Sequence, residues 1–205
     1  MRYFVTAIGT DSGKTIVSAM LCQMLNADYW KPVQCGYPRD TDSVSALTGT
    51  GITFHQESYL LQMPASPHAA AKDESVEIKL SGFEVPVTSN DLVIEGAGGA
   101  LVPLNDQDYV IDLVERFEAQ VVLVANLYLG SINHTLLTIE ALKSRKLSVK
   151  GIVFNGPSNE ESERIILQKS GWKCLGRINH EENVDTEMVI RYAALLKKNW
   201  HEELA

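Results

Sequence analysis

The chain has 205 residues, enough for one domain with a substantial core, and its 45% apolar and 21% charged residues are ordinary for a globular protein. Its 18 basic and 26 acidic side chains give a formal net charge of −8. This charge argues against nucleic acid as the main ligand, because phosphate backbones require clustered lysine and arginine, but it allows a single nucleotide.

Short β-rich runs alternate with stretches of helical spacing. We expect strands at 3–8, 29–34, 91–96, 120–126, 149–155 and 172–178, and helices at 14–25, 109–117, 132–145, 160–171 and 184–200. This alternation predicts an α/β fold, a mainly parallel sheet with helices on both faces, in a single domain spanning 1–205. Residues 49–90 lack a clear period and contain Pro64, Pro67 and Pro86. We expect them to leave the sheet near the site, with room for a short helix.

The cysteines and the N-terminal residues indicate a cytoplasmic protein. Cys22, Cys35 and Cys174 are odd in number and lack metal-ligand spacing, which suits a reducing compartment. The apolar run at the N-terminus is too short and is interrupted too early for a signal peptide. No apolar run is long enough to cross a bilayer. We therefore expect a cytoplasmic protein without a membrane or nucleic-acid partner.

The stretch IGTDSGKT, residues 8–15, lies between the first predicted strand and the first predicted helix. A strand, a glycine turn and a helix start bring backbone N–H groups and the positive helix end around phosphates. Lys14 would neutralise the β- and γ-phosphates, and the hydroxyl of Thr15 would ligate the Mg²⁺ that bridges them. A strict nucleotide loop has glycine where Ile8 stands, so an ordinary glycine turn is the alternative. The position between strand and helix favours phosphate binding and a P-loop NTPase-like fold.

Two further candidates lie in or after the second predicted strand. Lys31, in YWKPVQCG, lies near a strand end, where parallel sheets place their ligand crevice, although on spacing alone a surface lysine is the commoner interpretation. Asp40 and Asp42, in RDTDSVSAL, precede a short apolar helix. They fit either a helix N-cap or a carboxylate aimed at a metal, and this stretch alone does not decide between the two.

The string DLVIEGAGGALVPL, residues 91–104, ends an apolar strand in Glu95 and continues with three glycines, Gly96, Gly98 and Gly99. An acid at a strand end beside the phosphate loop is where such NTPases place a second metal carboxylate. Glycines after it let a backbone pass close to a ligand. The alternative is a tight turn with an exposed acid, but the rarity of the string favours a metal role.

Two later strand ends offer ligand contacts. NLYLGSINHTLLT, residues 126–138, predicts a helix start near Ser131 or Asn133, whose free N–H groups could hold a carboxylate or phosphate. His134 in this stretch is more often structural or solvated than a base. Asn155, in VFNGPS, carries an amide donor and acceptor that suit an adenine edge, although Asn-Gly-Pro is also ordinary turn chemistry.

Taken in order, these pieces resemble the dethiobiotin synthetases, ATP-dependent ligases that close the ureido ring in biotin synthesis. The strings that carry the resemblance are the GKT loop, YWKPVQCG, SPH at 66–68, VIEGAGG and LGSINHTLLT, and the match thins after about Gly176. The family loop has the form Thr-x-x-Gly-Lys-Thr. Residues 10–15 fit this form, so Ile8 is no defect.

The resemblance implies a role for each matching position. Lys14 and Lys31 match the two lysines that stabilise phosphoryl transfer. Thr15, Asp42 and Glu95 match the Mg²⁺ ligands, Asp42 being preferred to Asp40 because it directly precedes the predicted helix. The nucleotide-binding positions are Thr10, Asp11, Ser12, Gly13, Lys14, Thr15, Ile16, Glu95 and Asn155. The substrate-binding positions are Thr10, Lys31, Cys35, Gly130, Ser131, Ile132 and Asn133. The last four lie at a helix start that grips the substrate carboxylate across a homodimer interface.

Some positions depart from the family pattern. Cys35 stands where serine often contacts the substrate, and Asp11 is shorter than the usual glutamate. Pro86 breaks what is usually a helix. GRINH, residues 176–180, lacks the proline usual in the purine-side loop, which leaves nucleotide selectivity open.

The resemblance implies ATP, 7,8-diaminononanoate and CO2 or bicarbonate as substrates, with Mg²⁺. One amine and CO2 form a carbamate, which attacks the γ-phosphate of ATP to give a carbamic–phosphoric anhydride, and the second amine closes the ring. The main alternative is a regulatory deviant-loop ATPase whose nucleotide state controls dimerisation or partner binding, but residues 7–11 lack the extra lysine of its loop. A cobyrinate-type amidotransferase would need a further glutaminase domain, and a nucleotide-binding relic without catalysis is the third alternative.

Overall fold

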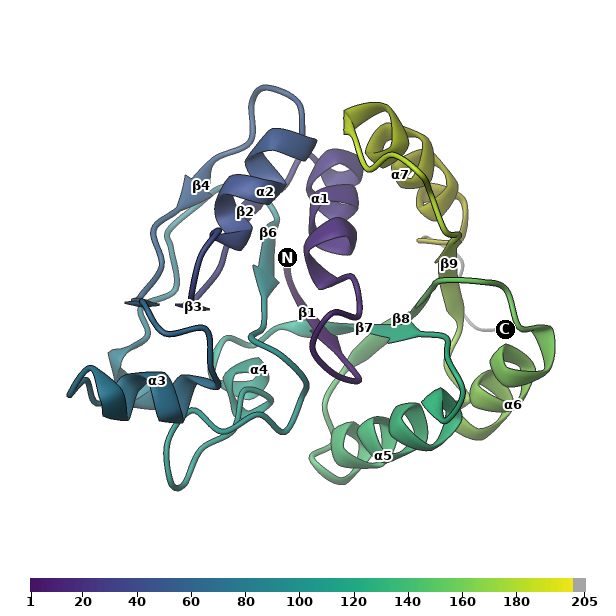
Figure 1. The fold of residues 1–205 in the computed structure, drawn as a ribbon. Coiled ribbons are helices and arrows are strands. Elements are labelled where there is room, and N and C mark those ends of the chain that lie inside the picture. Colours follow the sequence, from purple (N-terminus) through teal and green to yellow (C-terminus); the bar gives the residue numbers. More distant parts are fainter. Residues whose placement is uncertain (201–205) are drawn as a thin grey trace.

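The apolar runs of the sequence form a seven-stranded parallel sheet in the computed structural model, which describes residues 1–200 (Figure 1). The strands are β1 (Arg2–Ala7), β2 (Asp28–Trp30), β4 (Phe54–His55), β6 (Leu92–Glu95), β7 (Gln120–Asn126), β8 (Val149–Asn155) and β9 (Cys174–Ile178). Their order across the sheet is β4-β2-β6-β1-β7-β8-β9. The expected parallel α/β fold is confirmed, and the last residues of the expected domain, 201–205, lie outside the described residues.

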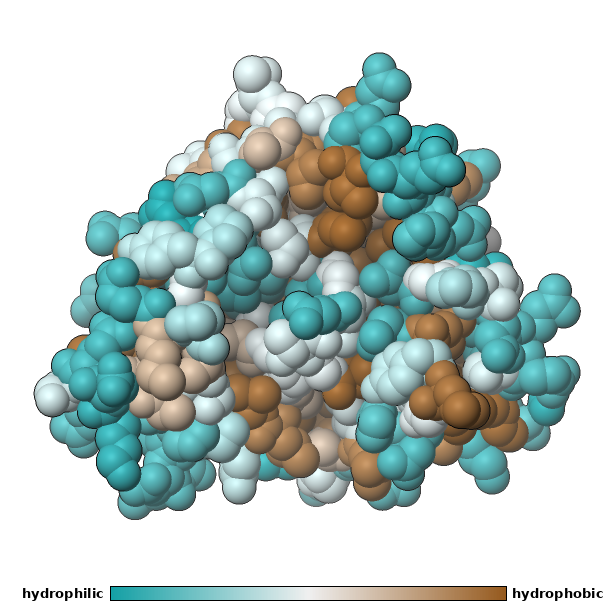
Figure 2. Space-filling view, viewed as in Figure 1, coloured by the Kyte–Doolittle hydropathy of each residue, from teal (hydrophilic) through white to brown (hydrophobic). Residues whose placement is uncertain are grey.

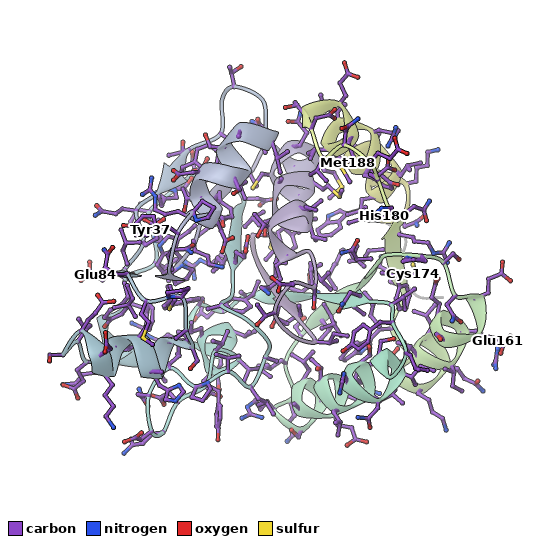
Figure 3. The ribbon with its side chains drawn as sticks, viewed as in Figure 1. Tyr37, Glu84, Glu161, Cys174, His180 and Met188 are labelled. Carbon is purple, nitrogen blue, oxygen red and sulfur yellow. The ribbon has the colours of Figure 1, made fainter. Side chains whose placement is uncertain are left out.

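Helices cover both faces of the sheet, as Figure 1 shows. The helices are α1 (Lys14–Leu25), α2 (Asp40–Leu47), α3 (Pro67–Asp73), α4 (Asp112–Arg116), α5 (Ser131–Ser144), α6 (Glu160–Ser170) and α7 (Thr186–Trp200). Helices α1 and α7 share one core with alternate strand residues such as Val5, and Met188 of α7 points into it (Figure 3). Helices α4, α5 and α6 share the other core with residues such as Phe4. Within residues 1–200, no helix is both long and apolar enough to cross a membrane.

The sheet has a switch point at β1. Strand β1 pairs with β6 on one side and with β7 on the other. Helix α1, which follows β1, packs in one core, whereas α4 and α5, which follow β6 and β7, pack in the core on the other face. In parallel α/β sheets, the carboxyl ends of strands at such a point border the ligand crevice. The loop after β1 therefore opens where a ligand site is expected.

The expected strand at 29–34 is divided by Pro32. Strand β2 stays in the main sheet, whereas β3 (Val33–Cys35) pairs with β5 (Tyr59–Leu61) in a separate two-stranded sheet. Proline has no N–H to donate to a ladder, so the strand cannot continue through it. Lys31 consequently lies where the chain leaves the main sheet.

The segment 49–90 is largely irregular, as expected, and contains the short helix α3 and a 3₁₀ turn at Leu80–Gly82. It does not leave the sheet completely, however, because β4 pairs with β2 at the edge of the main sheet. The expected helix at 109–117 is shorter at both ends than predicted. Tyr109 forms an isolated antiparallel bridge with Pro103, so the helix starts only at Asp112, whose side chain accepts a hydrogen bond from the Tyr109 N–H.

Candidate active site

A cleft of ≈ 700 Å³ opens beside the carboxyl ends of β2 and β6 and the start of α1. It is lined by Thr10, Asp11, Gly13, Lys14, Thr15, Ile16, Lys31, Val33, Gln34, Cys35, Asp40, Pro64, Ala65, Ser66, Pro67, Glu95, Ala97, Gly98 and Val102. Most positions predicted for nucleotide, metal and catalytic roles are thus in one place. Above all, Lys14 and Lys31 line the same cleft.

The phosphate loop is held from behind by two asparagines that end neighbouring strands. Asn126 ends β7, and its Oδ1 accepts a hydrogen bond from Ser12 Oγ at 2.8 Å. Asn155 ends β8, and its Nδ2 donates to Ser12 O at 2.9 Å. Ser12 is therefore turned toward the sheet rather than into the cleft. Asn126 was not predicted, and the signal for it was its position at the end of the strand beside β1.

Gly13 is required for this loop. Its φ of 94° is left-handed, and a Cβ there would lie 2.4 Å from Asn155 Nδ2. Asn155 thus sits directly beneath the start of α1 and gives one N–H to the loop. Among residues 1–200, its Oδ1 and second N–H have no hydrogen-bond partner. The predicted adenine contact stays a prediction.

Four side chains from separate elements converge at the centre of the cleft. Thr15 Oγ1, on α1, donates to Asp40 Oδ1 and Glu95 Oε1, both at 3.1 Å. Lys31 Nζ lies 2.7 Å from Asp40 Oδ2 and 3.1 Å from Glu95 Oε1. Lys31 is 3% exposed and Glu95 is 1% exposed, so the charges compensate one another away from water.

The pKa values of the cluster follow from this pairing. Burial alone would lower the pKa of Lys31, but the Glu95 and Asp40 carboxylates outweigh it and raise that pKa. Burial alone would raise the pKa of Asp40, but the Lys31 ammonium outweighs it and lowers that pKa. Burial and the nearby Lys31 charge lower the pKa of Lys14. Lys31 and Asp40 are therefore both ionised near neutral pH.

The expectation that Asp42 joins Thr15 and Glu95 is wrong. Asp42 is 57% exposed at its side chain and pairs with Arg39, with Arg39 Nη2 2.6 Å from Asp42 Oδ1. Helix α2 starts at Asp40, so Asp42, which was expected to precede the helix, lies within its first turn. Residues two apart on a helix do not share a face. Asp40 therefore points into the cleft, and Asp42 points away from it.

Two residues that the sequence analysis did not predict orient Asp40 and Glu95. Gln34 Oε1 accepts a hydrogen bond from the Asp40 N–H at 3.0 Å, which fixes the start of α2. Tyr29 Oη donates to Glu95 Oε2 at 3.0 Å. The signal for Tyr29 was its spacing, because residues two apart on a strand share a face and Tyr29 precedes Lys31 by two.

The 49–90 segment, which was expected to lie near the site, supplies part of the cleft wall. Pro64, Ala65, Ser66 and Pro67 line the cleft together with Cys35. Burial raises the pKa of the Cys35 thiol to about 11, although the Lys31 charge opposes this rise. Cys35 therefore stays a neutral thiol, which fits a contact residue rather than a nucleophile.

The start of α5 does not line this cleft. Gly130 precedes the helix with a left-handed φ of 102°, and Ser131 is buried. A smaller hollow of ≈ 390 Å³, whose lining includes His134 and Leu137 of α5, shares Thr10 and Val102 with the main cleft. Within one chain, the predicted carboxylate-binding residues Gly130, Ser131, Ile132 and Asn133 therefore lie near the site but outside it.

The segment after β9 lies beside Asn155. Gly156 N donates to Ile178 O at 2.9 Å, so the GRINH stretch runs next to the end of β8. Figure 3 shows His180 on this side of α1 and Tyr37 on the other. The stretch that departs from the family pattern is therefore adjacent to the predicted adenine contact.

Comparison with known proteins places the chain in a family. An AAA domain family model matches residues 1–188. The chain is 57% identical over 204 residues to the ATP-dependent dethiobiotin synthetase BioD of Cytophaga hutchinsonii, covering 98% of this chain and 99% of that protein. It is 43% identical to the protein of the same name from Christiangramia forsetii, covering 96% of each.

The chain belongs to the ATP-dependent dethiobiotin synthetase family. It is therefore an enzyme of the ligase type, and the resemblance carried by the GKT, YWKPVQCG and VIEGAGG strings is confirmed.

Solved structures of low identity share the fold of this synthetase. A ParA family ATPase from Chlorobium tepidum superposes with a TM-score of 0.56 at 14% identity, covering 96% of this chain and 92% of that one. The septum site-determining protein MinD from Pyrococcus horikoshii, complexed with Mg-ADP, gives a TM-score of 0.56 at 12% identity, covering 98% and 97%. The P-loop NTPase-like fold is confirmed.

The donors in the cleft of the synthetase fit a magnesium ion. Thr15, Asp40 and Glu95 supply a hydroxyl and two carboxylates, the hard oxygen ligands that Mg²⁺ prefers, and their oxygens already lie close together. Residues 1–200 hold no group of three or more His, Cys, Asp or Glu side chains that would cage a metal. Such a partial set suits Mg²⁺ carried by phosphates, because this ion keeps waters and substrate oxygens among its ligands.

Proposed function

We propose that the chain catalyses the ATP-dependent carboxylation and ring closure of 7,8-diaminononanoate with CO2, giving dethiobiotin, ADP and phosphate. The observation that carries this proposal is the shared cleft, in which two lysine ammonium groups lie with a hydroxyl and two carboxylates. The high identity to curated dethiobiotin synthetases supports the choice of substrate.

ATP would bind with its phosphates at the loop formed by Thr10, Asp11, Ser12, Gly13, Lys14, Thr15 and Ile16. Backbone N–H groups at the start of α1 and the positive helix end favour phosphate there. Lys14 Nζ lies 3.3 Å from Gly9 O and thus folds over the loop, where it would neutralise phosphate charge. The Oδ1 and the second N–H of the Asn155 side chain would meet the base.

Mg²⁺ bound by Thr15, Asp40 and Glu95 would neutralise the charge of the β- and γ-phosphates. Asp40 replaces Asp42 in this set because it is the acid that faces the cleft. Lys31 already touches both carboxylates and would lie next to the transferred phosphoryl group.

The two lysines have a second task in the first chemical step. An amine attacks CO2 only when neutral, and the pKa of an alkylamine is ordinarily ~10. The positive charges of Lys14 and Lys31 would lower the pKa of the bound amine and then stabilise the anionic carbamate. Burial strengthens this effect, because charges interact more strongly where water is excluded.

The remaining steps need positioning and charge neutralisation more than acid–base catalysis. The carbamate oxygen attacks the γ-phosphorus and ADP leaves, which gives a carbamic–phosphoric anhydride. The second amine attacks the carbonyl carbon, loses a proton, and expels phosphate. Among the described residues, no histidine lines the cleft, and Cys35 is a neutral thiol. We therefore propose no covalent enzyme intermediate.

The protein would work as a homodimer in the cytoplasm. Leu129 is fully exposed at the turn before α5, and Ile132 on the first turn of α5 is 36% exposed. Large exposed apolar side chains next to a site favour a protein partner. A second copy would bring Gly130, Ser131, Ile132 and Asn133 to the carboxylate of the diamine.

The proposed reaction is tested by incubating the protein with Mg-ATP and bicarbonate, with and without 7,8-diaminononanoate. We expect phosphate release that depends on the diamine. One phosphate should be released for each dethiobiotin formed, with dethiobiotin measured by mass spectrometry. Hydrolysis at the same rate without the diamine would contradict the synthetase and favour the regulatory ATPase.

A further inference from the structure

Tyr29 lies directly behind the carboxylate of Glu95. Strands β2 and β6 are hydrogen-bonded neighbours, with Tyr29 opposite Val93 and Trp30 opposite Ile94. Tyr29 is 0% exposed and does not line the cleft. Its side chain therefore reaches Glu95 from within the core rather than from the side on which a ligand would bind.

The two oxygens of Glu95 have different partners. Oε1 accepts hydrogen bonds from Thr15 and Lys31, on the cleft side. Oε2 accepts from Tyr29 Oη at 3.0 Å, and among residues 1–200 no other donor to Oε2 is present. A carboxylate with a donor on each oxygen has a fixed orientation, whereas a carboxylate held at one oxygen alone can rotate.

The hydroxyl of Tyr29 is itself fixed. The ring packs in the core shared with α1, and its centroid lies 6.0 Å from that of Phe54. Burial and the nearby Glu95 charge raise the pKa of Tyr29 well above its ordinary value. The phenol therefore stays a hydrogen-bond donor and takes no part in proton transfer.

We propose that Tyr29 is a positioning residue of this enzyme, which holds Glu95 so that Oε1 remains turned toward Thr15 and the cation site. The inference rests on the metal role of Glu95 in the proposed function. It adds a residue that never touches the ligand but sets the affinity of the site for the metal, because partners behind metal ligands typically alter metal affinity by about 10–100-fold.

The test compares Tyr29→Phe with a matched control, Tyr3→Phe. Tyr3 is 6% exposed, lies on β1 in the same core as Tyr29, and contacts Trp200 rather than Glu95. Mn²⁺ affinity is measured by electron paramagnetic resonance in the presence of ADP, and ADP affinity is measured separately in EDTA. Turnover is then followed as a function of Mg²⁺ concentration.

For Tyr29→Phe we expect Mn²⁺ binding weakened by about tenfold, with a similar rise in the Mg²⁺ concentration for half-maximal turnover. ADP affinity in EDTA, and turnover at saturating Mg²⁺, should stay near wild type. Tyr3→Phe should change none of these values. In a Glu95→Gln background, Tyr29→Phe should weaken Mn²⁺ binding by less than about twofold further, because its effect passes through the carboxylate.

Mn²⁺ affinity equal to wild type in Tyr29→Phe would overturn the proposal. So would an equal loss in the Glu95→Gln background, or a variant that no longer folds, since either indicates a structural role alone. A wild-type protein that binds Mn²⁺ with ADP but forms no dethiobiotin would contradict the proposed function. The Mn²⁺ affinities of wild type and Tyr29→Phe would then still decide whether Tyr29 positions Glu95.

Discussion

A single buried lysine organises the cleft. Lys31 is 3% exposed, and its ammonium is held between Asp40 and Glu95. Taking such a charge out of water is costly unless it is paired, and here two acids from different elements pair with it. Sequence alone favoured a surface lysine at this position, because neither the division of the strand at Pro32 nor the approach of α2 is visible in local spacing.

Lys31→Ala should lower turnover by ~10²-fold or more and leave ATP binding largely intact, because the charge it supplies matters most at the transferring phosphoryl group. Steady-state rates and ATP titration by calorimetry measure the two effects. Lys79→Ala is the control, since Lys79 pairs with Glu77 on the surface. Turnover near wild type in Lys31→Ala would remove this residue from the mechanism.

Asp40 and Asp42 offer a matched pair of substitutions on one helix. Asp40→Asn should lower Mg²⁺-dependent turnover by at least about tenfold, because Asp40 faces Thr15 and Lys31. Asp42→Asn should leave turnover near wild type, because Asp42 pairs with Arg39 outside the cleft. The comparison is made at fixed ATP over a range of Mg²⁺ concentrations. The reverse order of effects would restore Asp42 as the metal ligand.

Helices and strands built from long apolar runs were predictable from the sequence, whereas strands made by short pairings were not. The expected bounds of α1, β7 and β8 agree with the structure, because their hydrophobic patterns are long and unambiguous. Strands β4 and β5, of two and three residues, gave no periodic signal, since only pairing with distant residues makes them strands. Likewise, three residues act through partners on other segments that only the folded chain brings to them. These are Tyr29 with Glu95, Gln34 with Asp40, and Asn126 with Ser12.

Asp28, at the start of β2, ties the 49–90 segment to the sheet. It accepts hydrogen bonds from Thr88 Oγ1 at 2.6 Å, Asn90 Nδ2 at 3.1 Å and the Thr53 N–H at 3.3 Å. Burial alone would raise the pKa of Asp28, but the bonds from Thr88 and Asn90 outweigh it and lower that pKa. The ionised form is thus the one that the fold stabilises.

Asp28→Asn should reduce the free energy of unfolding by about 1–3 kcal/mol at pH 7. Because the folded-state pKa is lowered, the contribution of Asp28 is fully present above the ordinary aspartate pKa of about 3.9 and is lost as pH falls through the folded-state pKa. The difference between variant and wild type should therefore shrink between pH 5 and the lowest pH at which both fold, as measured by urea unfolding. A difference that grows toward low pH would contradict this account.

The sheet brings the phosphate loop, Thr15 and Glu95 together at the carboxyl ends of its strands, with Asp42 the exception among the predicted metal positions. It leaves apolar side chains uncovered near α5. On the face shown in Figure 2 hydrophilic residues prevail, with apolar residues gathered beside α1 and α7 and around α5. The sequence predicted a helix start near Ser131 or Asn133, and α5 begins at Ser131. The positions from Gly130 to Asn133 do not reach the cleft of their own chain. A homodimer would account for both the exposure and the distance.

Leu129→Asp should convert a dimer into monomers and raise the KM for the diamine, with little change in ATP affinity, because Leu129 is fully exposed beside α5. Light scattering coupled to size exclusion gives the mass. Val87→Asp is the matched control, since Val87 is also fully exposed but lies with Met1 and Arg2 at the opposite end of the sheet. A wild-type protein that elutes as a monomer while fully active would contradict the dimer.

In the proposed reaction, a carbamate oxygen attacks the γ-phosphate of ATP in the cleft between Lys14 and Lys31. The most direct test supplies CO2 labelled with ¹⁸O, together with Mg-ATP and 7,8-diaminononanoate, and analyses the released phosphate by mass spectrometry before the label exchanges with water. We expect each phosphate formed with dethiobiotin to carry one ¹⁸O from CO2. Phosphate without the label, formed at the same rate as dethiobiotin, would contradict the proposed reaction.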